Sequence, residues 1–224
     1  MITSDYKDGG SPNNDTFYAI GILDLSKGPV VLEHPDMGER YFTFELADMS
    51  SDNFDYIGKR ATGSKAGKFL IYHMDWKGEV PEGVRRAAPS PTPWVIIFGR
   101  TLVDGPSDAE TAYEISTHYK LTPLDYYMQN KTFKADSHDV WQPGDPKKDF
   151  LAPWKTMVRA MKENPPPEKD NLLMKWFSLI GIEPGAEFDS LSEEIKAELI
   201  RAEKTGMEIL RNAALSGYGN TRLN

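Results

Sequence analysis

Alternating aromatic segments in the first part of the chain constrain the fold most. In residues 41–46, every second side chain is large and apolar: Phe42, Phe44 and Leu46. A period of two is typical of a strand with one face on a core and the other toward solvent. The segment therefore predicts a half-buried strand of an antiparallel sheet.

Five further segments have a strand-like composition and are bounded by glycine or proline. They are residues 16–25, 30–33, 54–58, 68–72 and 94–98. We expect residues 30–33 and 41–46 to pair as a hairpin, and the continuous apolar run at residues 94–98 to be buried on both sides. Many short strands with such punctuation predict an antiparallel β-sandwich or partial barrel.

The second part of the chain predicts helices. The four helical segments are residues 107–119, 150–162, 170–180 and 190–216, with a long loop at residues 125–149. Capping boxes at residues 107–110 and 190–193 predict where the first and last helices begin. The fold class is therefore α+β: an antiparallel β-sandwich or partial barrel followed by a helical segment.

This pattern predicts three parts of the chain. Residues 1–104 form a β-rich body, residues 105–146 form a helix and a long loop attached to it, and residues 147–224 form a helical connecting segment.

Composition excludes several classes of function. The net charge of −8, with only isolated basic pairs, argues against nucleic-acid binding. The absence of cysteine excludes disulfides, thiol catalysis and thiolate zinc sites. The longest apolar run, residues 94–98, is too short to span a membrane, and the N-terminus has no signal peptide. We therefore expect a soluble chain whose compartment the sequence leaves open.

Polar residues before the first predicted strand form one candidate ligand site. Asn13, Asn14 and Asp15 supply amide and carboxylate oxygens that could bind a substrate or a hard cation. The alternative is structural, because Asn and Asp commonly fix turns by hydrogen bonds to the backbone.

Three charged residues in later loops are further candidates for ligand binding. Arg60 lies in a glycine-flanked loop, and Arg100 and Asp104 lie just beyond the predicted strand 94–98. Arg100 could clamp a carboxylate through two hydrogen bonds, and Asp104 could act as a base or an oxygen ligand. Equally, Arg100 could pair with Asp104 or Asp15 and hold the loops together.

The histidines and the later aspartates predict no metal site, and whether a metal binds elsewhere stays open. Its four histidines are scattered, with no pair at the spacing of metal ligands. The aspartates of residues 48–55 and 136–149 lack the pattern of a calcium loop. In residues 63–67 (GSKAG), serine stands one position too early for a nucleophile elbow. The sequence leaves open whether any cofactor binds.

Several segments together carry a family resemblance. They are residues 12–18 (PNNDTFY), 23–32 (LDLSKGPVVL), 56–63 (YIGKRATG), 90–95 (SPTPWV), 99–105 (GRTLVDG), 163–167 (ENPPP) and 217–221 (GYGNT). This set closely resembles the bacterial domain-of-unknown-function 1254 family over nearly the whole chain. Members of that family are typically joined to a C-terminal domain of unknown function numbered 1214.

The resemblance also implies what surrounds this chain in its relatives. Relatives usually carry a helical stretch, often with an export signal, before the Asn-Asn-Asp-Thr motif, and they continue into the β-rich second domain. On this comparison the chain is expected to be truncated at both ends and to lack its partner, the C-terminal domain. The resemblance allows a periplasmic or secreted location.

Two classes of function stay open, as does the question whether the chain is an enzyme. The first is a small-ligand-binding or hydrolase-type module in which the candidate residues share one cleft; an oxygen-ligated metal would serve the hydrolytic branch. The second is a structural or interaction domain that docks a second β-rich domain and has no catalytic site. It predicts an exposed apolar stripe on the last helix, formed by Leu191, Ile195, Leu199 and Ile209.

Overall fold

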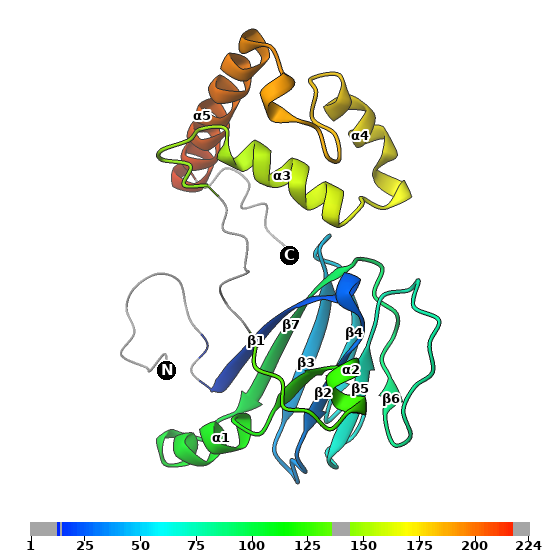
Figure 1. Ribbon diagram of the computed structural model, residues 1–224. Helices are drawn as coiled ribbons and strands as arrows, with labels where there is room; N and C mark the ends of the chain where they lie inside the picture. Colours follow the sequence, from blue (N-terminus) through cyan, green and yellow to red (C-terminus); the bar gives the residue numbers. More distant parts are fainter. Residues whose placement is uncertain (1–12, 14, 136–143, 217–224) are drawn as a thin grey trace. The chain divides into compact units, whose positions relative to one another are not determined.

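The chain divides into two compact units. The structure is a computed structural model that describes residues 13, 15–135 and 144–216 (Figure 1). The first unit, Met1–Ala135, contains all the strands found among the described residues, and we call it the sandwich unit. The second, Asp136–Asn224, is the helical unit. Each unit has its own buried apolar core.

Sheet A of the sandwich unit has four antiparallel strands. Their order is β1 (Thr16–Asp24), β7 (Trp94–Leu102), β3 (Phe42–Asp48) and β4 (Asn53–Gly58). The predicted alternation in β3 is confirmed, because Phe42, Phe44 and Leu46 are all buried. Their shared face forms one wall of the core.

Sheet B supplies the opposite wall. Its order is β6 (Arg85–Arg86), β5 (Gly67–Ile71), β2 (Val30–His34) and β8 (Lys120–Pro123), and only the short β5–β6 pairing is parallel. Leu32, Phe69 and Ile71 of this sheet pack with the apolar face of sheet A in one cluster. The predicted α+β sandwich is confirmed, and the two sheets do not close into a barrel.

The predicted hairpin between residues 30–33 and 41–46 is wrong. Strand β2 pairs with β5 and β8, whereas β3 pairs with β4 and β7. Residues 35–41 therefore carry the chain from one sheet to the other. The physical reason is that both strands bury apolar faces, which are covered by facing each other across the core and not by lying side by side.

Burial of residues 94–98 on both sides is also wrong. Along β7, buried and half-buried residues alternate, with Val95 and Ile97 in the core and Ile96 and Phe98 outside it. The outer residues belong to the solvent face of sheet A, where neighbouring Ile20 is 64% exposed. A continuous apolar run thus marks a strand with an apolar outer face.

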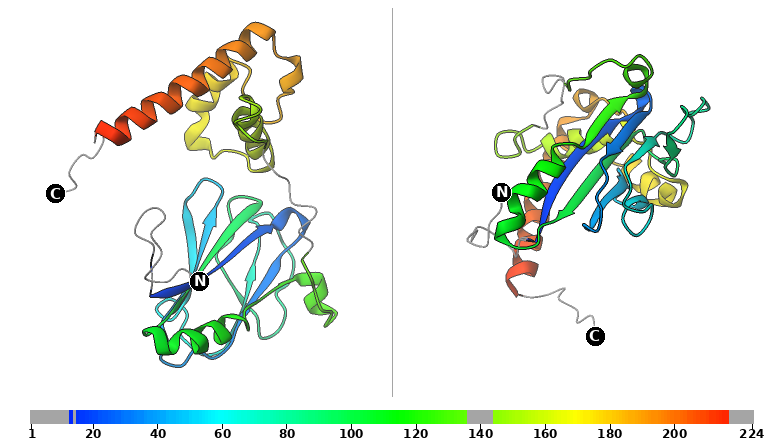
Figure 2. Two further views of the ribbon diagram at one scale, coloured as in Figure 1. Left: turned by 90° about the vertical axis from the view of Figure 1, so that its left-hand side faces the viewer. Right: turned by 90° about the horizontal axis from the view of Figure 1, so that it is seen from below.

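Smaller elements cover other surfaces of the sandwich unit. Helix α2 (Leu124–Met128) lies by the outer face of sheet B, where Leu124 packs on a second cluster of buried residues. Helix α1 (Ala109–Ser116) contacts β1 and β7 (Figure 2). The predicted capping box at residues 107–110 is wrong, because Pro106–Asp108 forms a 3₁₀ turn and Asp108 makes no cap hydrogen bond.

The helical unit confirms the other predicted helices with small shifts. They are α3 (Ala152–Glu163), α4 (Asn171–Ser178) and α5 (Glu193–Ser216). Its core contains Val158, Met161, Ile182, Phe188 and Leu199. The predicted start of the last helix is corrected, because Ser192, not Ser190, accepts the N–H of Ile195, at 3.3 Å. Within the described residues, none of the helices is long and apolar enough to cross a membrane.

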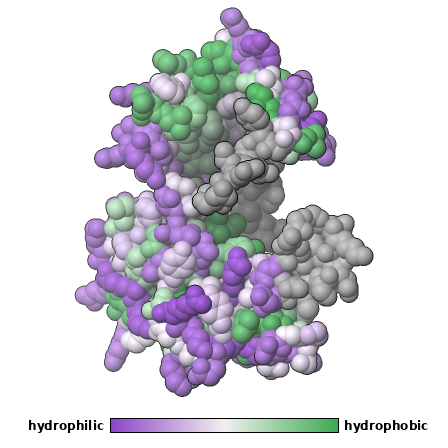
Figure 3. Space-filling view, turned by 180° about the vertical axis from the view of Figure 1, so that it is seen from behind, coloured by the Kyte–Doolittle hydropathy of each residue, from purple (hydrophilic) through white to green (hydrophobic). Residues whose placement is uncertain are grey.

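The apolar stripe predicted on the last helix is only partly exposed. Leu199 is buried, and Leu191 and Ile195 pack on the same core, so the prediction is wrong for these three. It is right for Ile209, which is 62% exposed. Apolar side chains gather at the surface of the helical unit (Figure 3).

Candidate functional site

The sheet topology brings most of the candidate residues to one end of the sandwich unit. The start of β1 pairs with the end of β7 through Thr16 and Leu102. The start of β3 pairs with both the end of β7 and the end of β4. The segments before β1, after β4 and after β7 therefore meet at what we call the loop end.

Asn13 and Asp15 form a turn that leads into β1. The side-chain oxygen of Asn13 accepts the N–H of Asp15 at 2.8 Å, and the Asn13 amide donates to the Thr16 hydroxyl. The carbonyl of Asp15 accepts the N–H of Val103 at 2.7 Å, while the Asp15 side chain is exposed. These contacts match the structural alternative for this motif. Asn14 lies outside the described residues.

Asp104 lies beside an ion pair that sequence reasoning missed. Arg40 Nη2 donates to Asp108 Oδ1 at 2.6 Å, and Arg40 Nη1 donates to the carbonyl of Leu102 at 2.6 Å. The backbone N–H of Asp104 donates to Asp108 Oδ2 at 2.9 Å. Hydrogen bonds from Arg40 and from this N–H lower the pKa of Asp108 to about 2. These hydrogen bonds among Arg40, Asp108 and the backbone of Leu102 and Asp104 hold the loop after β7, and we call them the Arg40–Asp108 brace. Arg100 takes no part in it.

Arg100 lies inside β7, not beyond it as predicted. The strand continues to Leu102 because it pairs on both sides, with β1 and with β3. The Arg100 guanidinium lies on the outer face of sheet A, 5.1 Å from the ring centre of Tyr18 and 5.4 Å from that of Phe98. Aromatic faces attract and orient a guanidinium in this geometry.

Arg60 reaches the same face from the turn after β4. Its guanidinium lies 5.4 Å from the ring centre of Tyr41. Arg60 and Arg100 line one hollow of about 560 Å³ together with Tyr41, Thr43, Glu45 and Tyr56. We call it the Arg60–Arg100 hollow. Neither guanidinium forms an ion pair within the part of the chain that the structure describes.

Sequence reasoning selected the two arginines but missed the aromatic residues around them. Tyr41 and Tyr56 lie in segments predicted as strands. Their positions on the solvent face of those strands could have indicated that they lie beside the arginines. Of the six candidates, Arg60 and Arg100 share a hollow, whereas Asn13, Asp15 and Asp104 form turns and loops.

The side chains that line the Arg60–Arg100 hollow supply positive charge and polar groups. Across residues 13, 15–135 and 144–216, the structure contains no group of three or more His, Asp or Glu side chains placed to hold a metal ion. The guanidinium groups of Arg60 and Arg100 line the hollow together with Tyr and Thr side chains and one carboxylate, Glu45. Fixed guanidinium groups of this type bind carboxylates through paired hydrogen bonds.

Comparison with known proteins places the chain in a family. Residues 1–123 match the family described as Protein of unknown function (DUF1254). The chain is also similar to the crystal structure of the VPA0106 protein from Vibrio parahaemolyticus, with 27% identity and a TM-score of 0.70, over 92% of this chain and 50% of that one. This chain thus spans about half the length of that protein, and no curated protein matches it. The chain belongs to the DUF1254 family.

Proposed function

We propose that the sandwich unit binds a small organic carboxylate in the Arg60–Arg100 hollow. One observation carries the proposal: two guanidinium groups, stacked on aromatic rings and without an ion pair among the described residues, line the same hollow. The volume of about 560 Å³ lies in the range of small-molecule sites.

The surface beside the hollow favours a carboxylate with an apolar body. Arg100 pairs with Tyr18 across β1 and β7, and Ile20 pairs with Phe98 two residues further along. Ile20 is 64% exposed and Ile22 is 63% exposed on the same face. An aromatic or aliphatic group attached to the carboxylate would remove this apolar area from water.

A charged ligand and its neutral analogue test the proposal. Isothermal titration of the full chain with phenylacetate and phenylacetamide should give tighter binding of the acid. Arg100→Gln should weaken phenylacetate binding about tenfold or more, because a hydrogen bond to a charged group contributes about 1.5–3 kcal/mol. Arg60→Gln should have a smaller effect because Arg60 is exposed.

Arg86→Gln is a matched control. Arg86 also stacks on aromatic rings, at 5.4 Å from Tyr72 and 5.7 Å from Trp76, but it lies in sheet B. Its substitution should leave phenylacetate binding unchanged. Equal affinity for the acid and the amide, or an Arg100→Gln variant that binds like the wild type, would overturn the proposal.

A second candidate function is favoured by the helical unit. Leu172, Trp176 and Leu179 follow one another along one side of α4 and its last turn, and they are 63%, 62% and 82% exposed. Contiguous apolar surface of this kind typically mediates contact with another polypeptide. We propose that the occupant is a β-rich domain of the 1214 type, to which members of the family are typically joined.

In this proposal the chain is one part of a longer two-domain protein, as the truncation predicted above implies. Its support is that the chain spans about half of the VPA0106 protein. The three-part division at residues 104 and 146 stays a prediction. The 1214-type domain of a relative, added as a separate chain, should form a complex in size-exclusion chromatography with light scattering.

Two variants of α4 test this docking. Trp176→Ser with Leu179→Ser should prevent the complex because both side chains belong to the exposed apolar side. Lys175→Gln, a polar change in the same helix, should leave it intact. A complex that survives the double substitution would rule out this surface as the docking site.

A further inference from the structure

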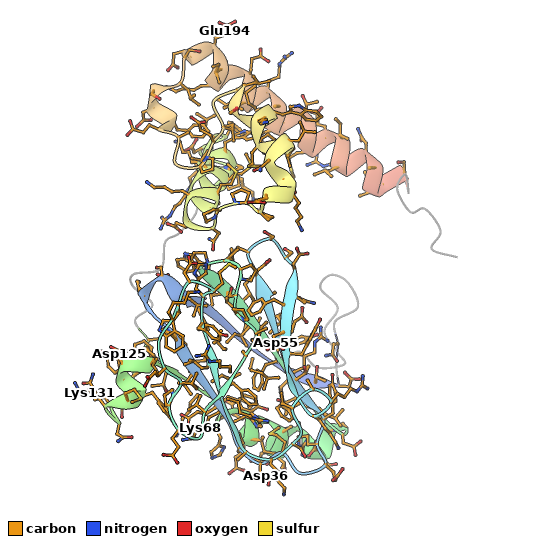
Figure 4. The ribbon with its side chains drawn as sticks, turned by 90° about the vertical axis from the view of Figure 1, so that its right-hand side faces the viewer. Asp36, Asp55, Lys68, Asp125, Lys131 and Glu194 are labelled. Atoms are coloured by element: carbon orange, nitrogen blue, oxygen red, sulfur yellow. The ribbon has the colours of Figure 1, made fainter. Side chains whose placement is uncertain are left out.

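A second hollow at the loop end has different chemistry. It has a volume of about 720 Å³ and is lined by residues 33–35 at the end of β2, residues 62–68, Gly83, Arg85, His118 and Lys120. It shares no lining residue with the Arg60–Arg100 hollow. Figure 4 shows Asp36 and Lys68 at this end of the sandwich unit. We call it the His34 hollow after the residue at its buried side.

His34 lines this hollow and holds beside it a hydrogen-bond acceptor that is unpaired within the described part of the chain. The side chain is 4% exposed, and Nδ1 lies 2.8 Å from the carbonyl oxygen of Pro35. A carbonyl oxygen only accepts, so Nδ1 carries the ring proton, and in the neutral ring Nε2 has a free lone pair. Nε2 is buried and has no hydrogen-bond partner among the described residues.

The surroundings of His34 favour the neutral form of its ring. Burial lowers the pKa of His34, and the nearby charge of Arg85 lowers it further, whereas the Pro35 carbonyl and Asp36 raise it. A buried acceptor without a donor destabilises the folded protein, so this nitrogen favours a ligand that brings its own donor.

Arg85 faces the same space as His34 Nε2. A methyl group placed on Gly67 would lie 2.7 Å from His34 Nε2 and 3.0 Å from Arg85 Nη2. A Cβ atom would clash at these distances, as it would with the Phe69 ring at 2.7 Å, so glycine allows the two nitrogens to lie close to each other. The Arg85 guanidinium is held 4.1 Å from the ring centre of Phe69, and its Nη1 donates to the carbonyl of Thr62 at 3.3 Å.

The charge of the His34 hollow opposes that of the chain. Its lining contains the cations Lys65, Lys68, Arg85 and Lys120 and one carboxylate, Glu33. Lys68 pairs with Glu33 at 3.2 Å, and Lys65 pairs with Asp36 at 3.0 Å. Arg85 and Lys120 form no ion pair among the described residues. In a protein of net charge −8, this is a local site for an anion.

We propose that the His34 hollow binds a small oxyanion that carries its own O–H group. The charged oxygens pair with the Arg85 guanidinium, and the O–H donates to His34 Nε2. Hydroxycarboxylates and hydrogen phosphate share this chemistry. Carboxylates without a hydroxyl group, and sulfate, supply the charge but not the donor.

Two matched pairs of anions test the proposal by isothermal titration of the full chain at pH 7.5. The pairs are lactate with propionate and phosphate with sulfate. In at least one pair, the member with the O–H should bind about tenfold tighter, because the other leaves a buried acceptor unpaired. The pair that shows the difference identifies whether the ligand is a hydroxycarboxylate or a phosphate. Equal affinities within both pairs would overturn the proposal.

Substitutions of His34 and Arg85 test which side chain causes the preference for the anion with an O–H group. His34→Phe keeps the aromatic packing against Phe42 and Phe69 and should abolish the difference within the pair. Arg85→Gln, an exposed position, should weaken both members about tenfold or more because a charged hydrogen bond is lost. Retention of the preference in His34→Phe, with thermal unfolding showing a folded variant, would overturn the role of Nε2.

Two controls separate this site from the carboxylate site proposed above. Arg86→Gln changes the next residue of β6 and should leave the affinities unchanged. Arg100→Gln should leave the difference within each pair unchanged, whereas it weakens phenylacetate binding. Loss of the preference for the O–H member in Arg100→Gln would place that preference in the Arg60–Arg100 hollow and overturn the proposal.

Discussion

The two units of the protein bury their apolar residues to different extents. In the sandwich unit, strands of both sheets contribute to one large cluster that includes the fully buried Phe42, Leu46 and Ile71. In the helical unit, five buried residues form the core, and α4 has no buried residue. Two sheets that face each other cover their apolar sides mutually, whereas a few short helices leave parts of theirs outside.

This difference separates two kinds of surface. The sandwich unit has a closed core and places charged and aromatic side chains on rigid strands and their loops, which suits the binding of small ligands. The helical unit has an exposed apolar side on α4, which suits contact with another polypeptide. Both functions are proposals, and the following predictions test the comparison on which they depend.

The largest expected effects come from the cores. Phe42→Ala should lower the free energy of unfolding of the sandwich unit by about 3–5 kcal/mol, and Ile182→Ala that of the helical unit by about 2–5 kcal/mol, because both residues are fully buried. Urea unfolding followed by amide hydrogen exchange would assign each loss to its unit. Equal loss of protection in both units from either substitution would contradict the division into two cores.

A smaller loss of stability is expected when the ion pair between Arg40 and Asp108 at the loop end is removed. Asp108→Ala should destabilise the sandwich unit by about 1–2 kcal/mol at pH 7, because it removes a paired hydrogen bond to Arg40 at a mostly shielded position. Urea unfolding midpoints measure the change. Asp104→Ala, which keeps the backbone N–H, is the control and should cost much less.

The ion pair between Arg40 and Asp108 also predicts that the stability of the folded protein depends on pH in the acidic range. The pKa of Asp108 is lowered from 3.8 to about 2 in the folded protein. The folded state therefore binds fewer protons than the unfolded state between these values, and the stabilisation is complete above pH 3.8 and is lost as the pH falls toward 2. The difference in stability between the wild type and Asp108→Ala should shrink over this range; a constant difference would refute the assignment.

Substitutions on the exposed side of α4 should have almost no effect on stability. Leu179→Gln should change the free energy of unfolding by less than about 0.5 kcal/mol, because the side chain is 82% exposed. Thermal unfolding compared with Ile182→Ala, a nearby buried position, tests this. A loss above about 1 kcal/mol would mean that Leu179 belongs to the core of this unit.

A further effect, confined to mildly acidic pH, is expected from His34. Its pKa is lowered in the folded state, so the folded protein binds fewer protons below pH 6.5 and loses stability as the pH falls through this value. Arg85 and Asp36 act on the ring in opposite directions, and the Pro35 carbonyl favours the charged form. His34→Phe should remove this part of the pH dependence measured by urea unfolding, and an unchanged profile would refute it.

Strands and helices with a clear period could be predicted from the sequence. The alternation of Phe42, Phe44 and Leu46 and the helical spacing around Leu199 were sufficient, since the period depends on local geometry. Pairing could not be predicted in the same way. The choice of β7 and β4 as neighbours of β3, instead of β2, depends on which faces meet across the core.

In the candidate sites, too, contacts between distant segments could not be predicted from the sequence. Polar and charged residues at loops were found from the sequence, and Arg60 and Arg100 do line one hollow. The roles of Tyr18 and Phe98 beneath Arg100, and the pairing of Arg40 with Asp108, were not predictable, because each joins residues that are distant in the chain. His34 looked like an ordinary scattered histidine.

By itself, the sequence determined most of the long strands and helices and the absence of thiol chemistry, because these depend on composition and short-range periodicity, whereas β6, β8 and α2 were not predicted. The tertiary structure alone decided which strands are neighbours and which side chains share a hollow. The buried acceptor of His34 beside Gly67 and Arg85 arises from three strands, and its chemistry exists only once those strands are paired.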